Sequence, residues 1–272
     1  MSGAGTGTGT GRAVASTAGR QSRRILGIRV DDVTNREALA HLERLIDAAG
    51  GIRGAAQVAT VNPEFVMAAR RDPAFRRVIE TAALALPDGV GLLVAARLRG
   101  ERLRERVAGV DTCVALAGLA ARRGWSLYLL GAAEGVAAEA AARLRERHPE
   151  LRIAGTESGS PAPEAAAATV ERIRRSGADI VLVAFGAPRQ DLWLAEHLAD
   201  TGARLGMGVG GAFDFISGRV PRAPRLVQRL GLEWLFRLVR QPWRWRRQLA
   251  LPRFLLLALY EARRRRPGRL AK

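Results

Sequence analysis

The sequence predicts an α/β fold in which helices cover both faces of a parallel β-sheet, followed by a basic helical appendage. Three observations support this prediction. Between residues 25 and 209, short apolar segments alternate with longer segments of helical periodicity, the pattern of strand–helix units. Residues 180–185 contain no polar side chain, as expected for a strand buried on both faces of a parallel sheet. After residue 218 the alternation ends, and arginine, leucine and tryptophan become frequent.

Each element is predicted from its apolar spacing and from the residues at its ends. The helix over 36–49 carries Leu42 and Ile46 on one face, with Thr34 or Asn35 as its N-cap. The predicted strands cover residues 25–30, 55–60, 84–86, 126–130, 151–154, 180–185 and 204–209. The predicted helices cover residues 36–49, 63–70, 73–81, 111–123, 136–147, 163–176, 189–199 and 226–239, and a further apolar segment covers 249–260.

The formal net charge of +18 is concentrated at the two ends of the chain. Residues 221–272 hold fifteen basic and two acidic residues, a charge of +13, and residues 1–24 carry +4. The first 24 residues are mostly Gly, Thr, Ser, Ala and Arg, with too little apolar content to fold and no apolar signal-peptide core. We therefore expect a disordered tail over 1–24, a core domain over 25–218 and an appendage over 219–272, in a cytoplasmic protein.

The appendage has the composition of a segment that binds a membrane surface. Residues 249–260 are apolar apart from Arg253, but twelve residues are too few to span a bilayer, which needs about 20. Arginines flank this segment on both sides, and such a pattern is typical of a helix lying in an anionic membrane interface. We expect a protein that is peripheral on the inner face of the plasma membrane.

Several site types are excluded by the residue inventory. The single cysteine, Cys113, rules out a disulfide framework and a multi-cysteine zinc site, and the three histidines are far apart in sequence. No Asp-x-Asp motif occurs, so a divalent metal that holds a nucleotide sugar has no obvious ligands. The glycine-rich residues 206–211 lack the lysine of a Walker-type phosphate loop. We expect neither a metal nor a cofactor.

Ligands of parallel sheets bind beyond the carboxyl ends of the strands, and this rule selects the candidate residues. Asp88 follows one predicted strand, where it acts either as a general base or as the N-cap of a helix over 90–98. Thr60 and Asn62 close another strand and share a face. They either bind a sugar or phosphate, or form a turn before Pro63.

Two further segments have the residue types of phosphate sites, each with a structural alternative. The turn over 131–135 offers backbone N–H groups to a phosphate, although Glu134 repels an anion, and the alternative is tight packing. In the appendage, four arginines follow one another at spacings of three or four residues, as on one helix face: Arg237, Arg240, Arg244 and Arg247. They form either a bidentate phosphate site or a solvated or lipid-facing basic surface.

Seven motifs occur in one order along the chain, and together they are far more specific than any one of them. They are residues 60–63 (TVNP), 87–91 (PDGVG), 106–111 (RVAGVD), 186–193 (GAPRQDLW), 208–214 (GVGGAFD), 222–224 (RAP) and 231–235 (GLEWL). Through these motifs the chain, from about residue 25 to about residue 250, resembles the WecG/TagA/CpsF family of bacterial glycosyltransferases.

The resemblance implies a reaction as well as a fold. Members of that family transfer a sugar from a UDP-sugar to a polyprenyl-diphosphate-linked sugar on the cytoplasmic face of the membrane. The transfer is inverting and metal-independent, and it feeds teichoic acid, enterobacterial common antigen or exopolysaccharide synthesis. The implied fold is a Rossmann-like sheet with an appendage that docks on the membrane and completes the active site. The donor stays open among UDP-ManNAc, UDP-ManNAcA, UDP-glucose and UDP-glucuronate, and so does homo-oligomerisation.

The resemblance also assigns site residues. It makes Asp88 the general base that removes a proton from the acceptor hydroxyl. The substrate-binding residues are then Thr60, Asn62, Arg106, Asp111, Gln190, Asp191, Arg237, Arg244 and Arg247. The last three would stabilise the departing UDP diphosphate in place of a metal. Two positions depart from the family pattern: Asp191 stands where Glu is usual, and Leu226 stands where many members have Trp.

Two other classes of protein compete with this interpretation. A basic nucleic-acid- or membrane-binding protein without catalysis is suggested by the net charge and by five tryptophans. Against nucleic acid as a partner, the excess charge is confined to the chain ends and no known nucleic-acid module appears. A nucleotide-dependent dehydrogenase would share the sheet, but a proper glycine fingerprint is missing after the first strand.

Overall fold

The structure, a computed structural model, describes residues 21–49, 54–229, 232–240, 242, 245 and 249–264. It begins with an antiparallel hairpin of β1 (Ser22–Ile25) and β2 (Ile28–Asp31). The backbone turns at Leu26 and Gly27, which both have positive φ, so the single strand predicted over 25–30 is wrong. β1 also takes in residues 22–24, which the sequence assigns to the tail.

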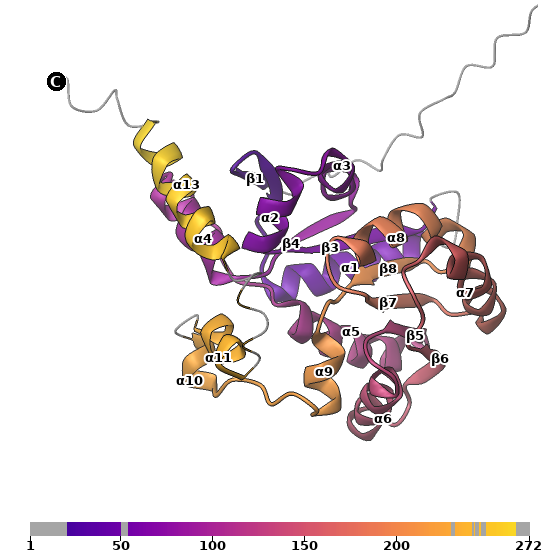
Figure 1. The fold of residues 1–272 in the computed structure, drawn as a ribbon. Coiled ribbons are helices and arrows are strands. Elements are labelled where there is room, and N and C mark those ends of the chain that lie inside the picture. Colours follow the sequence, from indigo (N-terminus) through magenta and orange to yellow (C-terminus); the bar gives the residue numbers. More distant parts are fainter. Residues whose placement is uncertain are drawn as a thin grey trace, which may run out of the picture.

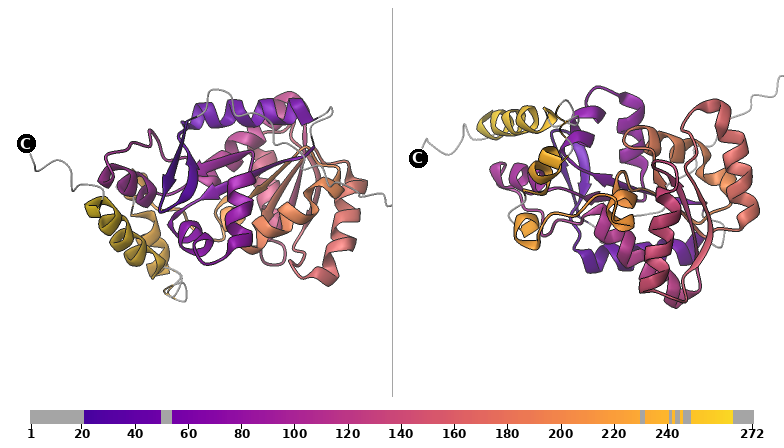
Figure 2. Two further views of the ribbon diagram at one scale, coloured as in Figure 1. Left: turned by 90° about the horizontal axis from the view of Figure 1, so that it is seen from above. Right: turned by 60° about the horizontal axis from the view of Figure 1, so that its bottom comes forward.

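Six strands in the described part of the chain form one parallel sheet, which confirms the predicted fold class (Figures 1 and 2). The strands are β3 (Ala56–Val61), β4 (Leu84–Pro87), β5 (Ser126–Gly131), β6 (Arg152–Glu157), β7 (Ile180–Ala184) and β8 (Leu205–Gly208). Their spatial order is β4-β3-β8-β7-β5-β6. The predicted apolar strand is the central β7, in which all five side chains are buried.

Helices cover both faces of the sheet, as predicted. One face packs against α1 (Asn35–Ala49), α5 (Gly109–Arg123), α6 (Val136–Arg147) and α9 (Ala212–Ser217). The other packs against α2 (Pro63–Ala69), α3 (Pro73–Thr81), α4 (Val90–Leu98), α7 (Pro163–Ser176) and α8 (Arg189–His197), which continues into a 3-10 turn (Leu198–Thr201). Neighbouring residues of β3 divide between the two faces, with Val58 in the first core and Ala59 in the second.

Local residue chemistry sets where the helices begin. Asn62 caps α2 by accepting a hydrogen bond from the backbone N–H of Phe65 at 3.0 Å, and Pro63 occupies the first helical turn. Asp72 caps α3 in the same manner, accepting from two backbone N–H groups. The elements therefore start close to their predicted positions, because caps and prolines are local signals.

The appendage departs from its prediction in two respects. The single helix predicted over 226–239 is wrong, because the structure contains two helices, α10 (Arg225–Arg229) and α11 (Glu233–Arg240). The residue before Leu232 in the sequence is a glycine, which is a poor helix former. The last helix, α13 (Ala250–Arg264), is longer than the predicted apolar segment. Pro252 lies in its first turn, where no intrahelical hydrogen bond is lost.

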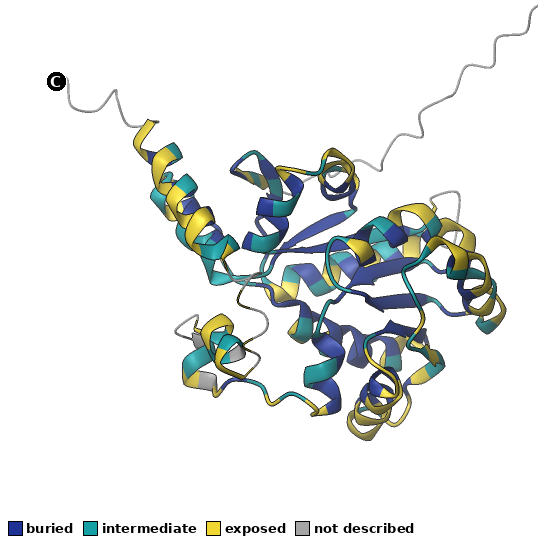
Figure 3. Ribbon diagram, viewed as in Figure 1, coloured by how far each residue is buried: buried dark blue, intermediate teal, exposed yellow. Residues whose placement is uncertain are grey.

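α13 lies beside α2 and α4, and it adds its apolar face to the second core (Figure 1). Phe254 and Ala258 are fully buried there, and Ala262 is nearly so. The opposite side of α13 is exposed, including Leu256 at 66% (Figure 3). Within the described residues, none of the helices has both the length and the apolar character required to cross a membrane.

Replacing Phe254 with alanine tests how firmly α13 is attached. We expect Phe254→Ala to reduce the free energy of unfolding by about 3–5 kcal/mol, since it leaves a cavity in a fully packed core. Leu256→Ala is the matched control on the same helix, and it should change stability by less than about 0.5 kcal/mol. Urea unfolding measures both; equal effects of the two changes would show that α13 is not packed in this manner.

Candidate active site

A cavity of about 690 Å³ opens at the carboxyl edge of the sheet. Residues at or just after the ends of five strands line it, which confirms the edge selected from the sequence. In the order β3, β4, β5, β7 and β8, these lining residues include Thr60, Asp88, Ala132, Ala184 and Val209. Helices α2, α4, α5, α8 and α9 also line it, and residues 219–272 contribute Arg222, Glu233, Trp234, Leu251 and Leu255. The core and the appendage therefore build one site.

Asp88 lies in this cavity, directly after β4. Its Oδ2 accepts a hydrogen bond from the backbone N–H of Gly109, at the start of α5, at 3.1 Å. The N-cap of α4 is Gly89 and has no side-chain cap bond, so the alternative that Asp88 caps this helix is wrong. Asp88 thus connects the end of one strand to the start of a distant helix, with its carboxyl group at the cavity wall.

The pKa of the Asp88 carboxyl is raised to about 6, first of all by desolvation. The N–H of Gly109 and the charge of Arg106 oppose this rise, while the charges of Glu233 and Asp111 add to it. A carboxylate with a pKa near 6 is ionised at neutral pH and still basic enough to accept a proton. Asp88 therefore has the protonation properties that a general base requires.

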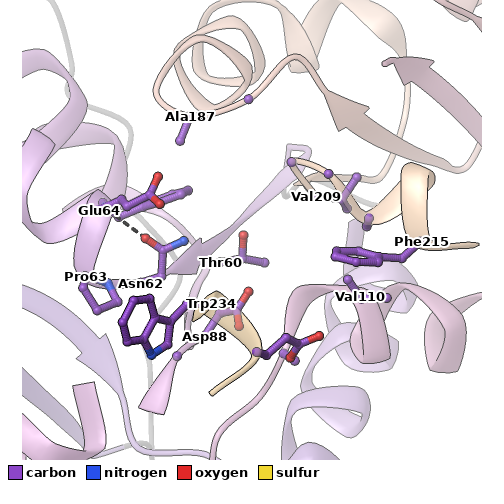
Figure 4. Close-up of a pocket in the computed structure, with 18 of the residues that line it drawn as sticks. Thr60, Asn62, Pro63, Glu64, Asp88, Val110, Ala187, Val209, Phe215 and Trp234 are labelled. Carbon is purple, nitrogen blue, oxygen red and sulfur yellow. Dashed lines mark hydrogen bonds between the residues drawn. The ribbon is translucent and has the colours of Figure 1, made fainter. Parts of the chain in front are cut away.

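Thr60 and Asn62 lie close to Asp88 (Figure 4). The Thr60 hydroxyl is buried and donates a hydrogen bond to the carbonyl of Gly208 at 3.0 Å, joining β3 to β8. A Cβ at Gly109 would stand 3.2 Å from the Thr60 methyl carbon and 3.4 Å from Asp88 Oδ2, so the glycine permits this close approach. Asn62 lines the cavity and is also the N-cap of α2, so it has a structural role, although as a helix cap and not in the predicted turn before Pro63.

Gln190 and Asp191 occupy the first turn of α8 and have different surroundings. Gln190 lines the cavity, and its Oε1 accepts from the backbone N–H groups of Gly186 and Gly210, both at 3.0 Å. It thereby fixes the loops after β7 and β8 relative to each other. Asp191 is fully buried behind Gly208 and is not among the residues that line the cavity. Burial raises its pKa to about 7, and the neighbouring Gln190 amide only partly opposes this.

Four charged residues form a network at the cavity rim. Arg106 donates to Glu233 Oε2 at 3.2 Å, and Arg222 donates to Glu233 Oε1 at 3.3 Å. Arg222 also holds Asp111 through two hydrogen bonds, which lowers the pKa of that carboxyl. Arg106, Arg222 and Glu233 line the cavity, whereas Asp111 lies beside it. The positive charge of Arg106 and Arg222 therefore faces the same space as Asp88.

Of the three arginines predicted in the appendage, the structure describes the position of only one along the chain. Arg237 belongs to α11, while Arg244 and Arg247 lie outside the described residues. Arg222 and Glu233 occur in the sequence motifs, but the sequence alone does not mark them as site residues. The signal that they belong to the site is their pairing with Arg106 and Asp111, which lie more than 100 residues earlier in the chain.

The turn after β5 fits both interpretations given to it. Ala132 and Ala133 line the cavity, so their backbone is within reach of a ligand. A Cβ at Gly131 would stand 2.7 Å from the carbonyl carbon of Ala184, so the glycine is also required for packing against β7. Among the described residues, no three histidine, cysteine, aspartate or glutamate side chains gather as they would around a metal ion.

The parallel sheet, the cavity at its carboxyl edge and a carboxyl group of raised pKa near arginines together fit a glycosyltransferase. The model of the "Glycosyl transferase WecG/TagA/CpsF family" matches residues 23–268, and the chain belongs to this family. It is 35% identical to the N-acetylglucosaminyldiphosphoundecaprenol N-acetyl-beta-D-mannosaminyltransferase of Bacillus subtilis strain 168, over 78% of this chain and 82% of that protein. The protein of the same name from Bacillus spizizenii strain W23 is 34% identical, over 76% and 79% of the two chains.

A substitution at Gly208 tests the packing beneath the cavity. A Cβ there would stand 2.7 Å from Gln190 Nε2 and 2.9 Å from Asp191 Oδ1, both on buried side chains. We expect Gly208→Ala to destabilise the protein by about 1–3 kcal/mol, because these side chains have no room to move aside. Gly54→Ala serves as the control in thermal unfolding, since a Cβ at Gly54 would meet no atom within 4 Å. Equal stability of the two variants would contradict the packing described.

Proposed function

We propose that this glycosyltransferase moves an N-acetylmannosamine-type sugar from a UDP-sugar to a polyprenyl-diphosphate-linked N-acetylglucosamine, in teichoic acid or related cell-surface polysaccharide synthesis. The observation that carries the proposal is Asp88, a carboxyl group of raised pKa held in a cavity with two arginines. The names of the two relatives supply the sugar and the acceptor. A related hexose or uronate donor would be accommodated by the same chemistry.

In the proposed mechanism, Asp88 accepts the proton of the acceptor hydroxyl as its oxygen attacks the anomeric carbon of the donor. The attack comes from the side opposite the leaving group, so the transfer inverts that carbon. The bond from the anomeric carbon to UDP breaks, and the diphosphate leaves with the electron pair. Arg106 supplies positive charge to this group from the core, and Arg237, Arg244 and Arg247 supply it from the appendage. The arginines take the place of a divalent metal.

The remaining predicted residues have positioning roles in this proposal. Thr60 and Asn62 place hydrogen-bonding groups beside Asp88, and Gln190 holds the two loops that form the opposite wall. Asp111 orients Arg222 at the rim. Asp191 is buried beneath Gly208, so its contribution is to the shape of the strand end and not to a substrate contact.

The appendage is proposed to bind an anionic membrane surface, which brings the cavity to its lipid-linked acceptor on the inner face of the plasma membrane. In the described part of the chain, all large apolar side chains that are exposed lie between residues 226 and 260. On α13 they are Leu255, Leu256, Leu259 and Tyr260, in the same helix as the buried Phe254. Apolar contact and arginine charge then act together at the membrane.

Changing Asp88 to asparagine tests the base. Asparagine keeps the shape and can still accept from the Gly109 N–H, but it cannot take up a proton. We expect Asp88→Asn to reduce kcat by about 10²–10⁴-fold, the usual contribution of a general base, with thermal stability close to that of the wild type. UDP release measured with a lipid-linked acceptor gives the rate. A rate near that of the wild type would remove Asp88 from the mechanism.

The pH dependence of the reaction is a second test. A base must be ionised to act, so protonation of Asp88 below its pKa of about 6 removes activity. We expect kcat/KM to be constant above about pH 7 and to fall about tenfold per pH unit well below about pH 6. Circular dichroism over the same range checks that the fold persists. Full activity at about pH 4.5 would contradict the raised pKa or the role of Asp88.

Vesicle binding tests the membrane surface. We expect the protein to co-sediment with vesicles that contain phosphatidylglycerol, more weakly at high salt and much less with neutral vesicles. Leu256→Glu should weaken this binding, because it places a charge on the exposed apolar side of α13. Arg143→Glu, an exposed site on α6, makes a larger change in charge and should leave binding unaltered. A larger loss in Arg143→Glu than in Leu256→Glu would indicate attraction by net charge alone.

A further inference from the structure

At the cavity rim, Arg106 and Arg222 are both hydrogen-bonded to the carboxylate of Glu233. The proposed sugar-transfer mechanism gives this carboxylate no role. Glu233 accepts hydrogen bonds from Arg106 and from Arg222, one on each oxygen. All three side chains line the cavity. Two guanidinium groups that face one anion across a cavity have the arrangement of a phosphate site, and here an internal side chain supplies the anion.

The two bonds to Glu233 are long for bonds between charged groups. They measure 3.2 and 3.3 Å, whereas such bonds are usually about 2.7–2.9 Å. On its other side, Arg222 binds Asp111 at 2.8 Å through Nη2 and more closely through Nη1. Arg222 is therefore held in place by Asp111 and only weakly engaged by Glu233. If Glu233 moved away, Asp111 would keep the Arg222 guanidinium oriented at the rim.

We propose that Arg106 and Arg222 form a diphosphate-binding site, and that Glu233 fills it until the diphosphate of a substrate displaces this side chain. The inference rests on the proposed function, and it adds Arg222 as a binding residue and Glu233 as an internal competitor. A diphosphate carries at least two negative charges and several acceptor oxygens, so it engages both guanidinium groups more fully than one carboxylate does. Glu233 satisfies the two arginines before the substrate binds and lowers the affinity of the site for it.

The position of Glu233 gives this exchange a structural consequence. Glu233 is the first residue of α11, and the next residue, Trp234, also lines the cavity. Displacement of the carboxylate breaks the ion pair between Glu233, at the start of α11, and Arg106, which precedes α5 in the core. Diphosphate binding and the attachment of α11 to the core are therefore coupled, and the appendage responds to an occupied cavity.

The test measures ligand binding by the full chain with calorimetry, so it does not depend on turnover. The probes are UDP, uridine and geranyl diphosphate, a soluble prenyl diphosphate that stands for the acceptor. We expect Glu233→Gln to tighten UDP binding by about fivefold, because it removes the competing charge while keeping the side-chain shape. Uridine, which lacks phosphate, should bind equally to both proteins. Arg222→Gln should weaken UDP binding and leave uridine binding unchanged.

Glu105→Gln is the matched control. Glu105 lies next to Arg106 in sequence and its substitution makes the same change in net charge, but its carboxylate accepts from Asn35 and not from the two arginines. This variant should bind UDP as the wild type does. Thermal unfolding of each variant confirms that the protein is folded before binding is compared.

The outcomes distinguish the diphosphate of the donor from that of the acceptor. They also distinguish failure of this proposal from failure of the proposed function. Tighter binding of geranyl diphosphate alone by Glu233→Gln would assign the arginine pair to the acceptor, whereas tighter binding of UDP alone would assign it to the donor. Unchanged or weaker binding of both ligands would overturn the proposal and make Glu233 a structural contact between α11 and the core. A folded wild type that binds neither UDP nor geranyl diphosphate would overturn the proposed function as well.

Discussion

The site depends on one constraint, the parallel direction of the six strands. Parallel strands bring all their carboxyl ends to one edge, so residues distant in sequence meet there without any special loop. Thr60, Asp88 and the loops after β5, β7 and β8 meet for this reason. Their close approach further requires small residues. At Gly208 a side chain would collide with Gln190, and at Gly109 it would crowd Thr60 and Asp88.

The chemistry follows from how charge is arranged around that edge. Burial raises the pKa of Asp88, and Arg106 lowers it, while Glu233 and Asp111 raise it further. The same three neighbours belong to the rim network that includes Arg222. A change in that network on ligand binding therefore also changes the electrostatic environment of Asp88. The proposed base and the proposed diphosphate site are two parts of one electrostatic unit, which the appendage completes through Glu233.

Much of the fold could be predicted from the sequence because its signals are local. Pro63 and Pro73 mark helix starts, and the apolar run of β7 marks a buried strand. The position of Asp88 after a strand indicates a site residue, and the structure puts it in the cavity. The Glu233–Arg106 pair could not be derived in this way, because it joins residues 127 apart in sequence. Likewise, Asp191 is buried because α8 packs beneath β8, and this packing cannot be predicted from the residues next to Asp191 in the sequence.

We propose that this cavity transfers a sugar from a UDP-sugar without a metal ion. The most direct test supplies the full chain with phosphatidylglycerol vesicles, a polyprenyl-diphosphate-linked N-acetylglucosamine analogue and a panel of UDP-sugars, and it measures UDP release in excess EDTA. We expect release with one donor, only when the acceptor is present, at the same rate with and without EDTA. Loss of release in EDTA, restored by a divalent cation, would contradict the claim that arginines replace the metal.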